Sequence, residues 1–127
     1  MSYQIIAWLQ SGTDFDLNSA ATRVRKYFPE AQLFTDDQSL TLVLQGWKAR
    51  LFLDDLPNVA LEAQEFPSLF PQCPRAAEIA QCLRRVEVLC PTDDPAMQHF
   101  DDFLLVCQAL EQFRGIILFD PLSGQLI

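Results

Sequence analysis

A hairpin is the clearest element that the pattern of apolar and polar positions predicts. Every second residue of the segment 40–44 is leucine, and residues 49–53 resume the alternation after the dipeptide Gln45-Gly46. Alternation of this kind is typical of a strand with one buried face, and a glycine-containing dipeptide between two such runs favours a tight turn.

Four further segments predict strands, because they are short, β-branched or apolar and end at turn residues or prolines. The run 115–119 is apolar almost throughout, which is typical of a central strand covered on both faces. The four segments are residues 3–9, 85–89, 115–119 and 125–127.

Helices are predicted where apolar residues recur at spacings of three and four. The strongest stripe covers residues 96–110, and we expect Asp93 or Asp94 to cap that helix and Pro95 to occupy its first turn. A second stripe covers residues 17–28, with Asp16 as a candidate N-cap. Two shorter helices are predicted over residues 57–66, ended by Pro67, and over residues 75–83.

This order of elements predicts an α+β fold with a single globular domain over residues 1–127. Strands separated by helices require crossover connections, and the helices must then cover the sheet. We expect a single mixed β-sheet with helices packed mainly on one face. The closest arrangement is a ferredoxin-like βαββαβ core extended by an additional αβ unit.

The charge of the chain narrows the classes of partner. The formal net charge is -8, and residues 86–113 contain six acidic side chains but no lysine or arginine. Phosphate contacts need clustered cations, so we expect no nucleic-acid partner. No apolar run approaches the roughly 20 residues that cross a bilayer, and the N-terminus lacks the pattern of a signal peptide. We therefore expect a cytoplasmic protein with no membrane partner.

The four cysteines do not form a recognisable metal or redox motif. They contain no C-x-x-C pair, and in a chain without an export signal reduced thiols are expected. Cys90 ends a predicted strand and Cys107 lies on an apolar helical face, so we interpret both as small buried hydrophobes. The other two are Cys73 and Cys82.

The single histidine, His99, is the remaining candidate for catalysis. It lies beside the apolar stripe of its helix and is expected to pair with Asp102 or Glu87. A catalytic role with Cys90 or Cys107 is the alternative. We expect no enzymatic activity, no cofactor and no metal site.

Acidic doublets recur along the chain and invite a metal-binding interpretation. Calcium loops place oxygen ligands at alternate positions around a central glycine, and neighbouring residues of an extended chain point apart. We therefore interpret the doublets as helix caps and turn residues. They are Asp36-Asp37, Asp54-Asp55, Asp93-Asp94 and Asp101-Asp102.

Two apolar residues are expected at the surface among acids. Leu105 falls among polar positions of its predicted helix, and Trp47 adjoins the hairpin turn. An apolar anchor inside a charged rim is typical of a recognition surface. The candidate partner-binding residues are Trp47, Asp54, Asp55, Asp101, Asp102 and Leu105.

The leading hypothesis is a non-enzymatic protein-binding module that presents an acidic surface to a basic protein partner, as an immunity or inhibitor protein does. The alternative is a small-ligand-binding or sensor domain, with an apolar pocket lined by phenylalanines between sheet and helices and gated by the proline-rich connector 67–74. A third hypothesis is a homo-oligomer built through the C-terminal edge strand, because Leu126 and Ile127 are apolar.

Overall fold

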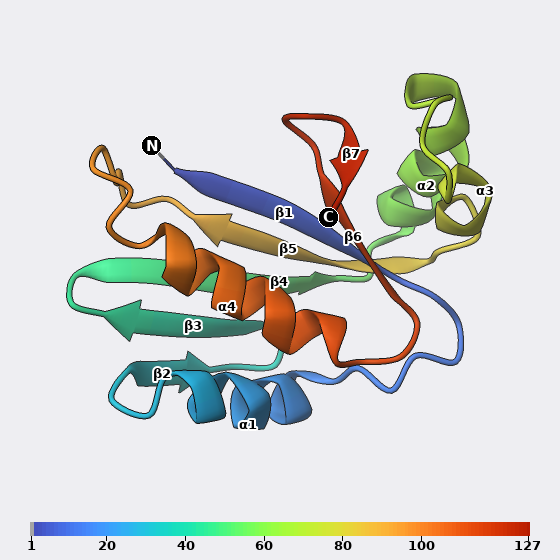
Figure 1. The fold of residues 1–127 in the computed structure, drawn as a ribbon. Coiled ribbons are helices and arrows are strands. Elements are labelled where there is room, and N and C mark those ends of the chain that lie inside the picture. Colours follow the sequence, from blue (N-terminus) through green and yellow to red (C-terminus); the bar gives the residue numbers. More distant parts are fainter. Residues whose placement is uncertain (1) are drawn as a thin grey trace.

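The computed structural model describes residues 2–127, which form one seven-stranded sheet and four helices (Figure 1). The strands are β1 (Tyr3–Leu9), β2 (Gln32–Thr35), β3 (Ser39–Leu44), β4 (Trp47–Asp54), β5 (Arg84–Cys90), β6 (Ile116–Asp120) and β7 (Gln125–Leu126). The helices are α1 (Leu17–Tyr27), α2 (Pro57–Leu69), α3 (Ala76–Ile79) and α4 (Phe100–Glu111). None of the helices in this part of the chain is long and apolar enough to span a membrane.

The sheet is antiparallel at every junction, so the prediction of a mixed sheet is wrong. Its order is β2-β3-β4-β5-β1-β6-β7. The crossover through α4 joins β5 to β6, and two strands joined in this way would make a parallel pair if they were neighbours. Here β1 lies between them and pairs with both. The order is therefore not that of the ferredoxin-like core that we expected.

Strand β2 was not predicted from the sequence. It is a four-residue edge strand that pairs only with β3. Leu33 packs partly against the core, whereas Phe34 is 57% exposed. A strand with a single inward apolar residue has too little alternation to be recognised by pattern.

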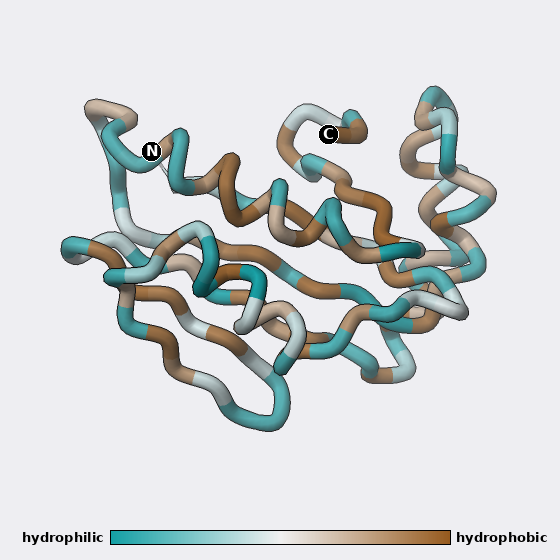
Figure 2. Tube along the Cα trace, turned by 60° about the horizontal axis from the view of Figure 1, so that its bottom comes forward, coloured by the Kyte–Doolittle hydropathy of each residue, from teal (hydrophilic) through white to brown (hydrophobic). Residues whose placement is uncertain are grey.

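Strand β1 is covered on both faces. Ile5, Ala7 and Leu9 belong to the core layer under α1 and α4, whereas Trp8 belongs to a second layer under α2 and α3. Successive residues of a strand point to opposite faces, so the two pairs of helices lie on opposite sides of the sheet. The prediction of helices mainly on one face is wrong for this reason. Figure 2 shows brown stretches along the central strands, interrupted by teal at polar positions.

The second helical layer covers only one end of its face. In Figure 1, α2 and α3 lie together at the right-hand end of the sheet, away from β2 and β3. We call the remaining outward surface of β2 to β5 the open half. Register and burial assign to it Phe34, Thr41, Val43, Lys48, Arg50, Phe52, Glu87 and Leu89.

The predicted hairpin is confirmed, and its turn explains the sequence at positions 45 and 46. Leu44 pairs with Trp47, and the two residues between them have positive φ angles of 51° for Gln45 and 82° for Gly46. Two consecutive positive φ angles are the geometry of a type I′ turn, which matches the twist of the flanking strands.

Helix α1 begins and ends as the sequence predicts. The Asp16 carboxylate accepts a hydrogen bond from the Ser19 backbone N–H at 2.7 Å, and the helix ends at Tyr27, before Pro29. The guanidinium of Arg25 donates to carbonyls beyond the C-terminus, including that of Ala31 at 2.6 Å. A cation at this position also interacts favourably with the helix dipole.

Helix α4 begins at Phe100, later than expected, because Asp94 has a different role from a helix cap. Asp94 is 4% exposed and accepts hydrogen bonds from the Tyr3 hydroxyl at 2.7 Å and from the backbone N–H groups of Gln98 and His99. Burial alone would raise the pKa of the Asp94 carboxyl. The hydrogen bonds outweigh burial and hold the pKa below its ordinary value. Asp94 therefore fixes the segment before α4 to the start of β1.

The Tyr3→Phe substitution tests this attachment. It keeps the aromatic ring, which stacks on Phe103 at 4.9 Å between centroids, but removes the hydroxyl donor of Asp94. Loss of a partner from a buried charged group costs about 1–3 kcal/mol, and urea unfolding should show a decrease of this size. The control Tyr27→Phe removes a surface hydroxyl and should change stability by less than about 0.5 kcal/mol. Equal effects of the two substitutions would contradict the role given to Asp94.

Candidate functional site

The structure divides the predicted partner-binding residues between the two ends of the sheet. Trp47 is the first residue of β4 and Asp54 the last, so about 23 Å of strand separates them. Asp102 belongs with Trp47, because the His99 ring stacks on Trp47 and its Nδ1 lies 2.9 Å from the Asp102 carboxylate. Asp55 follows Asp54 at the other end. The predicted residues therefore do not form one surface.

Two of these residues are not exposed as expected. Trp47 is 1% exposed, because the turn places its indole in the core layer and the His99 ring covers it at 5.3 Å between centroids. Leu105 is only partly exposed and packs against the same layer. The buried side of α4 includes Val106 and Ala109, which lie beside the apolar stripe predicted from the sequence. The buried side is shifted because α4 contacts α1 as well as the sheet.

Asp54 is also not free to meet a partner as a surface charge. Its side chain is 8% exposed and lies 3.7 Å from the Arg85 guanidinium. Asp55 and Asp101 are exposed as expected. Asp102 is partly exposed and pairs with His99, as one of the two sequence alternatives for that histidine predicted.

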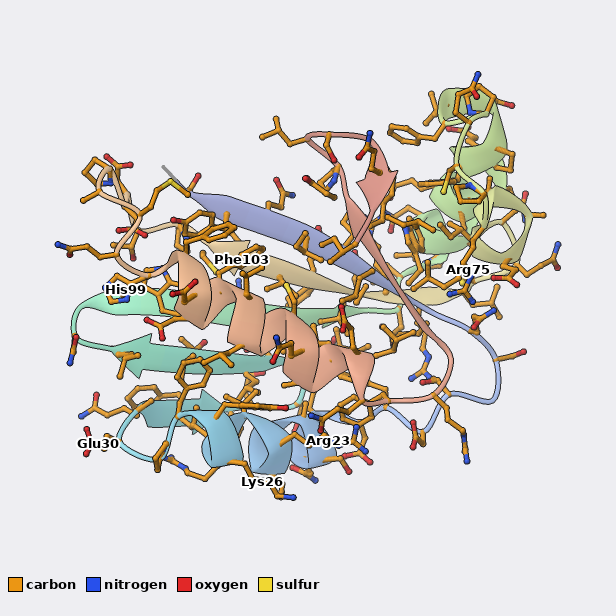
Figure 3. The ribbon with its side chains drawn as sticks, in the orientation of Figure 1. Arg23, Lys26, Glu30, Arg75, His99 and Phe103 are labelled. Carbon is orange, nitrogen blue, oxygen red and sulfur yellow. The ribbon has the colours of Figure 1, made fainter. Side chains whose placement is uncertain are left out.

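Charged side chains are distributed around the molecule. Figure 3 shows Arg23 and Lys26 on α1, Glu30 at the end of α1 and Arg75 beside α3. Arg75 forms an ion pair with Glu78 in the next turn. Cations thus lie on more than one part of the molecule, and we looked for the candidate site in local clusters of side chains.

The cysteine thiols and His99 do not form a nucleophile and base pair. All four thiols are free and buried, which confirms the burial predicted for Cys90 and Cys107. Burial raises the pKa of Cys90 and of Cys107 to about 12 and that of Cys82 to about 11, so these thiols remain protonated at neutral pH. Within residues 2–127, no three His, Cys, Asp or Glu side chains come together in a group that could hold a metal ion.

An aromatic cleft lies where α2 meets the sheet, and it is the best candidate site. Its volume is about 320 Å³, at the lower end of the range of ligand pockets. Trp8, Phe66, Phe70 and Phe119 form its walls, with ring centroids 4.8–6.1 Å apart in edge-on or tilted pairs. We call this feature the aromatic cleft.

The rim of the aromatic cleft is acidic. Glu62 and Glu65 line it from α2, and Arg85 lines it from β5. The Arg85 guanidinium forms an ion pair with Glu62 and lies near Asp54 and, at 4.0 Å, near Glu87. We call Asp54, Glu62 and Glu87 the carboxylate cluster. One arginine thus faces three acids, and Glu65 adds a fourth close by.

Burial and neighbouring carboxyls together raise the pKa of Glu87. Burial raises the pKa of this carboxyl, Arg85 opposes the rise, and the neighbouring carboxyls of Asp54 and Glu62 add to it. Arg85 is also incompletely satisfied, because its Nε is buried and has no hydrogen-bond partner among the described residues. Its guanidinium carbon lies 5.3 Å from the Trp8 ring.

No role for Trp8 or Arg85 was predicted from the sequence. The sequence does indicate that Trp8 is buried, because residues 5–9 are apolar at every position. A strand with this pattern needs cover on both faces. No sequence signal identified Arg85, since its acidic partners come from β4, α2 and β5 and meet only in the folded chain.

The Glu87→Gln substitution tests the charge excess. The pKa of Glu87 is higher in the folded state than in the unfolded chain, so ionisation of Glu87 disfavours the fold. The free energy of unfolding therefore falls as the pH rises through the folded-state pKa. Glutamine cannot ionise, and the variant should gain stability relative to the wild type between about pH 4 and pH 7. Urea midpoints measured across this range check the trend, with Glu30→Gln as the exposed control. A variant whose disadvantage grows with pH would contradict the assignment.

Comparisons of the chain with protein families, with curated protein sequences and with solved structures found no match. The candidate site is therefore defined by its own contacts: four aromatic rings, one arginine and a carboxylate rim. These contacts determine which kind of ligand the cleft could hold.

Proposed function

We propose that this protein is a non-enzymatic binding module whose aromatic cleft receives a cationic side chain of a basic protein partner. The observation that carries this proposal is a cleft lined by four aromatic rings, Glu62, Glu65 and Arg85, with Asp54 and Glu87 within 4.0 Å of that arginine. The partner class is the one that the sequence favours. The surface is different, because the acidic rim of α2 replaces the surface of α4 that contains Asp101.

The walls and rim of the cleft suit a long cationic side chain. The stem of lysine or arginine is apolar and packs on aromatic rings, while its charged end is attracted by ring faces and carboxylates. Glu62 and Glu65 are both exposed. Glu62 is already paired with Arg85, so an incoming cation meets Glu65 first and shares Glu62 with Arg85. The acidic rim also increases the rate of encounter with a basic partner at low ionic strength.

Binding is favoured over catalysis by the state of the reactive groups. Cys82, Cys90 and Cys107 are held as protonated thiols by burial, and the His99 ring is stacked on Trp47 and paired with Asp102. A thiol nucleophile needs a lowered pKa or an adjacent base. The cleft itself contains groups that attract and orient a cation.

A small cationic molecule with an apolar body is the second candidate for the same cleft. The feature that favours it is the adjoining hollow of about 410 Å³ between the proline-rich connector and the β6–β7 turn, which shares Leu69, Phe70 and Pro121 with the cleft. A ligand larger than one side chain could extend into this hollow.

Fluorescence of Trp8 provides a direct test. The chain has two tryptophans, so the Trp47→Phe variant reports on the cleft alone. A short peptide with one central lysine or arginine should change the Trp8 emission, whereas the same peptide with norleucine or citrulline should not. Replacing Glu62 and Glu65 with glutamine should weaken binding about three- to tenfold, and added salt should weaken it further.

The Asp101→Asn variant is the matched control, because this exposed acid lies on α4, at the other end of the sheet. It should bind the cationic peptide as the parent does. If Asp101→Asn weakens binding while Glu62→Gln and Glu65→Gln have no effect, the binding site lies on α4 and not at the aromatic cleft. Equal binding of the cationic and neutral peptides would show that the cleft recognises apolar bulk alone.

A further inference from the structure

The open half is a partly apolar surface that carries two cations, Lys48 and Arg50, and one acid, Glu87. Phe34 is 57% exposed and Leu89 is 43% exposed, and Val43 and Phe52 are partly exposed between them. Lys48 and Arg50 are exposed on the same surface of β4, and the Arg50 guanidinium lies over the Phe52 ring. Large apolar residues gathered on an uncovered sheet face are typical of an interaction surface.

The outward side of α2 has the complementary character. Val59, Ala63 and Phe66 face the sheet and are buried. Leu61 is 62% exposed, and an ideal helical wheel places it roughly opposite the buried stripe, with Glu65 about 40° away. Leu69, which is 66% exposed, lies on the same side of the axis as Glu65. This side of α2 therefore carries one acid, Glu65, between exposed leucines, whereas the open half carries two cations and one acid, Glu87.

From this complementarity we propose that a second copy of the chain covers the open half, with α2 of each protomer packed on the open half of the other. The two copies would be related by a two-fold axis near Phe52 and Leu89, so that each contact occurs twice. Leu61 and Leu69 would pack against Phe34 and Val43, and Glu65 would meet Arg50 and Lys48 of the other copy.

The open half can receive part of α2. Helix α2 has 13 residues and is about 20 Å long. The open-half residues of β4, from Lys48 to Phe52, span about 13 Å along the strand. Within one protomer, α2 lies over one end of the face, and a two-fold rotation places the second α2 over the other end. The two helices would then form a middle layer between two sheets.

This inference goes beyond the proposed function, with which it shares Glu65 and the rim of the cleft. It needs no separate partner, and it uses the outward side of α2 instead of the cleft interior. It also differs from the homo-oligomer expected through Leu126 and Ile127, which would join sheet edges and leave the open half uncovered.

Charge reversal within one chain tests the dimer. Sedimentation velocity over a micromolar concentration series should show self-association of the wild type. Arg50→Glu and Glu65→Arg should each weaken the dimer about tenfold or more, because each places two like-charged pairs in the interface. The double variant Arg50→Glu/Glu65→Arg restores the pairs between positions 50 and 65 with reversed polarity, while Lys48 then faces a cation. It should therefore dimerise more strongly than either single variant.

Two controls make the result specific. Glu111→Arg changes an exposed acid on α4 and should leave the dimer unchanged, and Leu126→Lys should do the same unless the sheet edges are the contact. A wild type that stays monomeric across the series, a double variant no stronger than the single ones, or loss of the dimer in Leu126→Lys would overturn the inference. Circular dichroism confirms that each variant is folded.

The same variants separate this inference from the proposed function. Arg50→Glu leaves the aromatic cleft intact, so the monomeric variant should still bind the cationic peptide. If it dissociates but the cleft does not respond to the peptide, the dimer stands and the proposed function fails. If the wild type is monomeric and the cleft responds, the proposed function stands and the dimer fails.

Discussion

The burial of β1 between two helical layers is the constraint on which the rest of the structure depends. Alternate residues of this strand serve two cores, one under α1 and α4 and the other under α2 and α3. The second layer is short, with 13 residues in α2 and four in α3, and covers only part of its face. Both notable surfaces follow from this partial cover: the aromatic cleft at the boundary of α2 and the open half beyond it.

The fold was predictable where a local pattern decides the structure. The hairpin around Gln45-Gly46, the cap at Asp16 and the buried strand β6 follow from short-range rules of alternation, capping and turn geometry. The strand order was not predictable, because it depends on β1 lying between β5 and β6. No local pattern encodes that placement.

The candidate site was harder to predict than the fold. Trp47 was expected at the surface because it follows a turn, yet the pleat directs its indole inward. The carboxylate cluster combines Asp54, Glu62 and Glu87 from three elements around Arg85. The charge pattern along the chain indicated that acids would gather, but only the fold determines which acids become neighbours and which cations neutralise them.

The position of β1 in the sheet also affects how the chain reaches its fold. Tyr3 pairs with Cys90 and Leu9 with Ile116, so the first strand to leave the ribosome waits for partners near the other end of the chain. The β2–β3–β4 meander can form earlier, since its pairings are between neighbours in sequence. Pairings between distant segments slow folding and leave apolar strands uncovered in the meantime. Nascent β1, with Trp8 and its aliphatic neighbours, therefore stays unpaired until β5 and β6 have been synthesised.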